Sequence, residues 1–149
     1  ALLAAGAGVG LTDATGRTPL MLAAQGGNAE CVRLLLEAGG DIHTRDARGR
    51  TALMLAAQQG NAKVVGMLLA AGSEVDAQDA EGRTALMFAV VRPPSGDANL
   101  SPDTVKLLLD AGADREKRDF YGERVLDRFY IRHRPEILEL FNLKPEDVK

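Results

Sequence analysis

The residues most suggestive of chemistry lie near the start of the chain, where glycine recurs at every second position. Gly6, Gly8 and Gly10 are the residue type that lets a backbone close around a phosphate group. A phosphate-binding loop, however, follows a strand, opens a helix and ends in Gly-Lys-Ser or Gly-Lys-Thr. None of these features accompanies this run. We therefore predict no nucleotide site and no cofactor.

Side chains that catalyse reactions or bind metals are few and scattered. The chain has one cysteine, Cys31, and two histidines, His43 and His133, which lie 90 residues apart. Neither histidine has neighbours at the spacing of a catalytic triad or a zinc site. A single cysteine excludes a disulfide framework within the chain, and we expect a buried, unreactive thiol. We predict no catalytic residue, no metal ligand and no enzyme activity.

A column of arginines is the strongest candidate for binding chemistry. Arg17, Arg50 and Arg83 recur at intervals of 33 residues. If the chain folds into stacked units, their guanidinium groups line up about 10 Å apart, and Arg48 adds a fourth positive charge. Guanidinium groups bind carboxylates through paired hydrogen bonds, which would suit an acidic peptide or loop. The alternative is that these hairpin arginines are merely solvated.

The arginine spacing reflects an internal repeat of the sequence. DATGRTPLMLAA at residues 13–24 returns as DARGRTALMLAA at 46–57 and as DAEGRTALMFAV at 79–90. Asp-x-x-Gly is typical of a tight turn, and the threonine that follows it can cap a short helix. Each unit is therefore a turn followed by two helices, with an apolar face that only a neighbouring unit can cover.

The second helix of each unit contains a run of leucines or similar apolar residues. A residue that can cap the start of a helix precedes this run, and a glycine that can end a helix follows it. Asn28 and Asn61 are the predicted N-caps. Gly39, Gly72 and Gly112 stand where a left-handed residue ends a helix. The periodicity thus predicts an all-α solenoid, with hairpin-like loops between the helix pairs.

The repeat also predicts the organisation of one domain over residues 1–149. We expect a partial unit at 1–12, full units at 13–45, 46–78 and 79–118, and a C-terminal capping unit at 119–149. The third unit is seven residues longer than the 33-residue period, and the extra residues lie near Pro93 to Leu100. This insertion is either a neutral surface loop or part of a binding face. Leu2 and Leu3 are expected to lie partly uncovered at the open end of the stack.

These units resemble the ankyrin repeat, whose pattern is a 33-residue unit with Thr-Pro-Leu-His at the first helix. The histidine of that pattern is replaced here by Met21, Met54 and Met87, which we expect to hold neighbouring units together by packing. The resemblance implies a protein-interaction module that binds its partner on a concave face formed by hairpin tips and first helices. Carried over by position, the candidate contact residues are Arg17, Gln25, Arg48, Arg50, Gln58, Gln59, Arg83, Arg92, Phe120 and Tyr121.

Aromatic residues are concentrated in the last unit. Phe120 and Tyr121 occupy hairpin-tip positions, and exposed tyrosine beside arginine is typical of binding hot spots. Phe129, Tyr130 and Phe141 are better explained as packing of the cap. Aromatic side chains among basic residues also suit single-stranded nucleic acid, but the chain carries a net charge of −3. We therefore expect a protein partner and no nucleic acid.

Composition limits the remaining function classes. Apolar residues make up 46% of the chain, enough for a folded core, and no apolar run reaches the ~20 residues of a membrane span. We expect a monomeric, intracellular and most simply cytoplasmic protein that binds a partner, with or without an acidic segment, and does not bind a membrane. Two alternatives remain: a regulatory or targeting segment of a larger enzyme or effector, and an engineered repeat scaffold.

Overall fold

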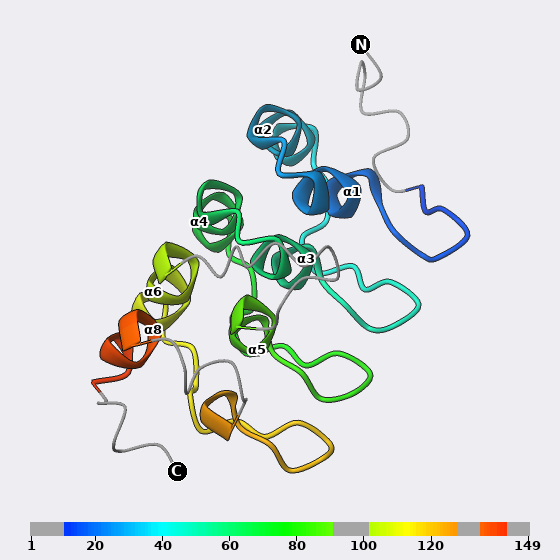
Figure 1. Cartoon of the computed structure of the whole chain (residues 1–149). Helices are drawn as coiled ribbons and strands as arrows, with labels where there is room; N and C mark the ends of the chain where they lie inside the picture. Colours follow the sequence, from blue (N-terminus) through cyan, green and yellow to red (C-terminus); the bar gives the residue numbers. More distant parts are fainter. Residues whose placement is uncertain (1–10, 91–101, 128–134, 143–149) are drawn as a thin grey trace.

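The computed structural model describes residues 11–90, 102–127 and 135–142, and these ranges contain helices, turns and loops but no strand. The inner layer of helices consists of α1 (Pro19–Gly26), α3 (Ala52–Gln58), α5 (Ala85–Val90) and the 3₁₀ helix η2 (Val125–Asp127). The outer layer consists of α2 (Ala29–Glu37), α4 (Ala62–Ala70), α6 (Pro102–Asp110) and α8 (Pro135–Leu140). The two layers run side by side along the stack (Figure 1). The predicted all-α solenoid is confirmed.

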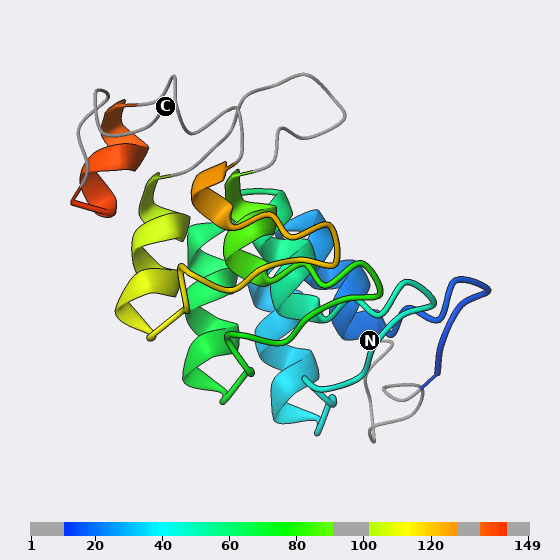
Figure 2. The same cartoon turned by 90° about the horizontal axis from the view of Figure 1, so that it is seen from below.

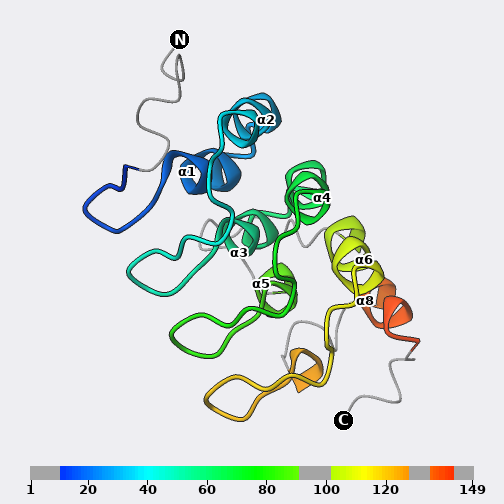
Figure 3. The same ribbon diagram turned by 180° about the vertical axis from the view of Figure 1, so that it is seen from behind.

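Four hairpin loops project from the inner layer on the side away from the outer helices (Figures 1 and 3). We call them the first to fourth hairpins, and they comprise residues 13–17, 46–50, 79–83 and 119–123. Seen from below, they form a row that extends beyond the helices (Figure 2). We call this surface the hairpin row.

Threonine residues fix the start of the inner helices. Thr18, Thr51 and Thr84 each accept a hydrogen bond at Oγ1 from the backbone N–H three residues later, at 3.2, 3.3 and 3.4 Å. This bond satisfies one of the amide groups that a helix start leaves without a partner. At Thr51 the cap is reciprocal, because its own N–H donates to the Sδ atom of Met54 at 3.5 Å. The methionine that replaces histidine therefore takes part in the cap as well as in packing.

Small and aliphatic side chains fill the space between the units. Leu20, Leu53 and Leu86 are each 1% exposed, as are the three methionines that follow them in sequence. Every residue in 52–57 of α3 and in 85–90 of α5 is buried. Because alanine is frequent in these helices, their backbones can approach closely and bury both faces against neighbouring units.

Left-handed glycines end the outer helices as predicted. Gly39, Gly72 and Gly112 have φ angles of 89°, 97° and 91°. At the end of α2, the N–H of Gly39 donates to the carbonyl of Leu36, and the N–H of Gly40 donates to that of Leu35. These paired bonds satisfy carbonyls that the helix end would otherwise leave open.

The predicted caps of the outer helices behave differently from each other. Asn28 caps α2 through a hydrogen bond from the Cys31 N–H at 3.1 Å. Asn61 stands at the N-cap of α4 but makes no side-chain cap bond. Its amide group lies instead against Gly27, where a Cβ atom would come within 2.5 Å of Asn61 Nδ2. The Asn61 side chain thus covers the left-handed turn of the preceding unit rather than its own helix.

Several expectations at the ends of the stack have different outcomes. Phe141 is 1% exposed, and the Arg115 guanidinium lies 5.2 Å from its ring centre, as expected for cap packing. Cys31 is half-buried rather than buried. Leu2, Leu3, the insertion near Pro93 to Leu100, Phe129, Tyr130 and His133 lie outside the described residues.

Candidate functional site

Backbone hydrogen bonds hold the hairpins in fixed register. The tip carbonyls of Thr15, Arg48 and Glu81 each accept a bond of 2.9 Å from an N–H of the next hairpin along the stack. The three donors are Ala47, Ala80 and Phe120. One such bond per junction makes the hairpin row a continuous hydrogen-bonded surface rather than four independent loops.

Each hairpin is also closed internally by its aspartate. In the second hairpin, Asp46 Oδ1 accepts the N–H groups of Arg48 and Arg50 at 2.9 and 2.8 Å. The N–H of Gly49 donates to the Asp46 carbonyl, and Gly49 has a φ of 75°. This pattern is that of a type I turn followed by a bulged glycine. It repeats at Asp13 and Asp79.

The arginine column is not the free basic stripe that its spacing suggested. Arg50 is 8% exposed, and its Nε and Nη2 atoms each lie 2.9 Å from Asp46 Oδ2. The Asp46 carboxylate is itself 1% exposed. The expectation of an exposed, unpaired guanidinium at Arg50 is therefore wrong, because a buried carboxylate four residues earlier binds it.

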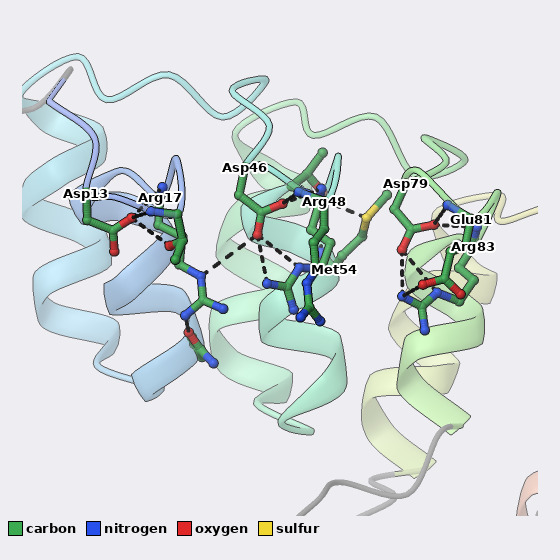
Figure 4. Close-up of polar contacts among 12 residues, drawn as sticks. Asp13, Arg17, Asp46, Arg48, Met54, Asp79, Glu81 and Arg83 are labelled. Atoms are coloured by element: carbon green, nitrogen blue, oxygen red, sulfur yellow. Dashed lines mark hydrogen bonds and ion pairs between the residues drawn. The ribbon is translucent and has the colours of Figure 1, made fainter.

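The other two arginines of the column are also paired. Arg83 contacts Asp79 Oδ2 at 3.0 Å and Glu81 Oε1 at 3.3 Å, and its guanidinium lies 4.8 Å from the ring centre of Phe88. Arg17 reaches across the junction, with Nε 3.8 Å from Asp46 Oδ2 (Figure 4).

Arg17 also donates from Nη1 to Gln25 Oε1 at 2.8 Å. Asp46 therefore lies between arginines of two successive units. All three column arginines form ion pairs with carboxylates of this chain.

A second column, which the sequence interpretation missed, stands one residue before the aspartates of the second, third and fourth hairpins. Arg45 Nη1 donates to the Gly49 carbonyl of its own hairpin and to the Gln78 carbonyl of the next unit, at 3.2 and 2.5 Å. Gln78 Nε2 likewise donates to the Gly82 carbonyl of its own hairpin and to the Arg118 carbonyl of the next unit, at 2.8 and 3.0 Å. The signal was present, because Arg45, Gln78 and Arg118 share one position in the repeat. It was not recognised because arginine and glutamine have in common only a long side chain ending in N–H donors.

The exposed groups of the hairpin row are the residues at its tips. Thr15, Arg48, Glu81 and Tyr121 share one tip position, and all four are exposed. Tyr121 is 75% and Phe120 71% exposed, as expected for contact residues, although their backbone N–H groups are fixed by Asp119 and Glu81. The backbone N–H of Arg48 donates to Asp46 Oδ1, but within the described residues its guanidinium forms no ion pair with a carboxylate.

The inner helices contribute less surface than their sequence predicted. Gln25, Gln58 and Gln59 are half-buried at the ends of α1 and α3. The helical residues before Gln58, and all of α5, are buried. Arg92 lies outside the described residues. The accessible part of this face is therefore dominated by the hairpins.

Charge is unevenly distributed along the hairpin row. In the second hairpin, Arg48 and Arg50 outnumber Asp46. In the third hairpin, Asp79 and Glu81 outnumber Arg83, and the fourth contains Asp119 and Glu123. The row thus has a basic second hairpin followed by acidic ones, and the arginine at its tip position is Arg48.

Hydrogen bonds also shift the ionisation of two carboxyl groups near the row. The Thr15 hydroxyl, together with the Arg17 N–H, holds the pKa of Asp13 below its ordinary value of 3.8. Beneath the fourth hairpin, hydrogen bonds from Arg124 lower the pKa of Asp127, and the same contacts together with Glu116 raise the pKa of Arg124. Each shift favours the charged form that the ion pair or turn uses.

The described residues contain no group of three His, Cys, Asp or Glu side chains that could hold a metal ion. Across the same ranges, no helix combines the length and apolarity that crossing a membrane requires. Gly6, Gly8 and Gly10 lie outside these ranges.

Comparison with known proteins bears on this architecture directly. A family profile of ankyrin repeats in three copies matches residues 1–79 and again residues 39–119. A search of curated proteins gives no match. The matched ranges cover most of the chain and contain the first three hairpins with their helix pairs. The chain therefore belongs to the ankyrin-repeat family, whose repeats mediate protein–protein interactions and are typically non-catalytic.

Proposed function

We propose that this chain is a non-catalytic interaction module whose protein partner lies across the hairpin row and the adjoining ends of α1 and α3. The observation that carries the proposal is the tip column, in which Thr15, Arg48, Glu81 and Tyr121 are exposed on a backbone locked by inter-unit hydrogen bonds. Because these residues are already positioned, a partner orders few groups of this chain when it binds.

Two contacts define the chemistry of the partner. Tyr121 and Phe120 offer a large aromatic surface at the fourth hairpin, where an apolar side chain of the partner would be buried. Arg48 offers an exposed guanidinium at the second hairpin, where a partner carboxylate would make a charge-assisted pair. Neighbouring hairpins are about 10 Å apart, so these contacts lie roughly 20 Å from each other.

An acidic segment in the partner therefore belongs opposite the second hairpin rather than along the whole arginine column. The side chains of Arg17, Arg50 and Arg83 contact carboxylates of this chain and so stabilise the hairpin row. The half-buried glutamines Gln25, Gln58 and Gln59 can add polar contacts at the helix ends. The cysteine of the described residues is not disulfide-bonded, which fits the intracellular location that we propose.

Site-specific photo-crosslinking tests this proposal. A photoreactive phenylalanine analogue is placed at Arg48 or at Tyr121 and, as the matched control, at the exposed outer-helix residue Lys63. We expect one and the same protein to be crosslinked from both hairpin positions in a lysate of the source cells, and not from Lys63. The partner identified in this way should bind Tyr121→Ser at least tenfold more weakly. Crosslinking from Lys63 alone would place the binding surface on the outer helices instead.

A further inference from the structure

The backbone N–H groups of the second, third and fourth hairpins are all used within the protein. In residues 46–50, the N–H of Ala47 donates to the preceding hairpin, and the others bond to acceptors within the same turn. The same bonds recur in residues 79–83 and in residues 119–123. These three hairpins therefore offer no backbone donor to a partner.

The bonded backbone of the row limits the conformation that a partner can adopt against it. An extended segment could not pair with the hairpins as an added strand, because strand addition requires free backbone donors as well as acceptors. Its own carbonyl groups would be buried without a backbone donor, which costs free energy. An α-helix bonds its N–H and carbonyl groups to each other, so it needs only side-chain contacts. The hydrogen bonds of the row thus favour a helical partner.

Three tip residues present different chemistry at regular intervals along the row. Arg48, whose guanidinium forms no ion pair in the described part of the chain, is followed by Glu81 and then by Tyr121. The Glu81 side chain is 48% exposed and contacts only one cation, Arg83, at 3.3 Å. Arg48 and Glu81 are exposed although a hairpin lies on each side of them. The exposure is therefore a property of the tip position.

The spacing of the tips matches the repeat of an α-helix. Neighbouring hairpins are about 10 Å apart, and seven residues of an α-helix rise about 10.5 Å. Residues seven apart also stay on one face, with a drift of only about 20° per interval. A helix that lies along the row therefore brings every seventh residue to a tip.

We infer that the partner contacts the hairpin row with an α-helix that carries an acidic, a basic and an apolar residue at successive seven-residue intervals. The acidic residue pairs with Arg48, the basic residue with Glu81, and the apolar residue packs on Tyr121. The inference rests on the proposed function and names the partner's chemistry at that surface. The tips set this order for either chain direction of the helix.

Selection from a phage-displayed helix library tests the inference without knowledge of the partner. The probe is the surface helix of a small, stable three-helix protein, with its outward-facing positions randomised over about six turns. Helices that bind the chain should show the acidic, basic and apolar residues seven apart, in one direction or the other. A library of extended, proline-containing peptides, randomised to the same extent, is the control and should yield no binder of comparable affinity.

An exchange of two tip residues then tests the order of the charges. The second and third hairpins, DARGR and DAEGR, differ only at the tip, so the double variant Arg48→Glu with Glu81→Arg keeps both turn sequences and should fold. Exchanging the acidic and basic residues of a selected helix should weaken its binding to the unaltered chain about tenfold, because each charge then meets a like charge. The double variant should prefer this exchanged helix. Lys63→Glu, which alters an exposed charge on α4, should not change the preference.

Four results would overturn the inference: no selected helix, selected helices without the stated order, tighter binding by extended peptides, or a double variant, folded by circular dichroism, that keeps the original preference. If any of these accompanies crosslinking of one protein from both Arg48 and Tyr121, the proposed function stands and only the helical partner is lost. Crosslinking from Lys63 alone would instead remove the proposed function, and this inference with it.

Discussion

Replacing Arg50 tests whether the arginine column belongs to the fold. Arg50→Met keeps much of the aliphatic stem and removes the guanidinium that contacts Asp46. If Arg50 were a solvated tip residue, the free energy of unfolding would change by less than about 0.5 kcal/mol. The structure predicts a much larger loss.

The expected magnitude follows from what Asp46 keeps after the substitution. Removing one member of a buried ion pair costs about 3–5 kcal/mol when the other charge is left without compensation. Asp46 still accepts two backbone N–H groups, and Arg17 remains 3.8 Å away, so the loss should lie at the low end, about 3 kcal/mol. The same substitution at Arg83, whose side chain is 24% exposed, should cost about 1–2 kcal/mol because water reaches the pair.

Urea denaturation followed by the helical circular dichroism signal measures these differences. Arg50→Met should also lower the Tm by roughly 10 °C. A double-mutant cycle with Asp46→Asn isolates the pair itself, and we expect a coupling energy of about 2 kcal/mol. The reasoning is refuted if Arg50→Met is as stable as the unaltered chain, or if the two substitutions are additive.

Three further outcomes are expected. Gly27→Ala should destabilise the fold more than Gly39→Ala. Each substitution places an alanine at a left-handed φ, which costs about 1–2 kcal/mol, and only the Cβ at Gly27 also clashes with the next unit. Equal urea midpoints for the two variants would argue against this clash. Arg45→Met should lower the free energy of unfolding by about 1 kcal/mol and speed amide exchange in the second and third hairpins, whereas unchanged exchange would remove the second column from the coupling between units. Thr15→Val should raise the pKa of Asp13 towards its ordinary 3.8, as followed by carbon NMR. Since the lowered pKa favours the folded carboxylate, its contribution to stability is present above about pH 4 and disappears as pH falls through the folded pKa; an unchanged titration would exclude the hydroxyl as the cause.

The conformation of individual turns was predictable from sequence because it depends on residues close together in the chain. Asp-x-x-Gly followed by threonine specifies a turn and a helix start through bonds spanning two to four residues. The same holds for Gly39 at the end of α2. The 33-residue period then requires such units to stack, because no unit can cover its own apolar face.

The function of each hairpin side chain was not predictable in this way. Arg50 and Arg48 are both arginines of one turn, and nothing in their identity shows that one is buried against Asp46 and the other exposed. Both lie in the same turn as Asp46, and the choice depends on how the surrounding structure covers that turn. A side chain four residues from an aspartate can turn back to it or point outward, and only the packed stack decides between the two.

The sequence by itself thus determined the repeat, the turns, the helix ends and the family, all of which follow from local bonds and periodic apolar residues. Only the tertiary structure decided that the arginine column is internal and that Arg45 and Gln78 couple the units. The physical reason is that both features depend on the packed stack. Arg45 and Gln78 bond to carbonyls 33 and 40 residues away, and the Arg50–Asp46 pair, although it spans only four residues, is buried by the surrounding structure.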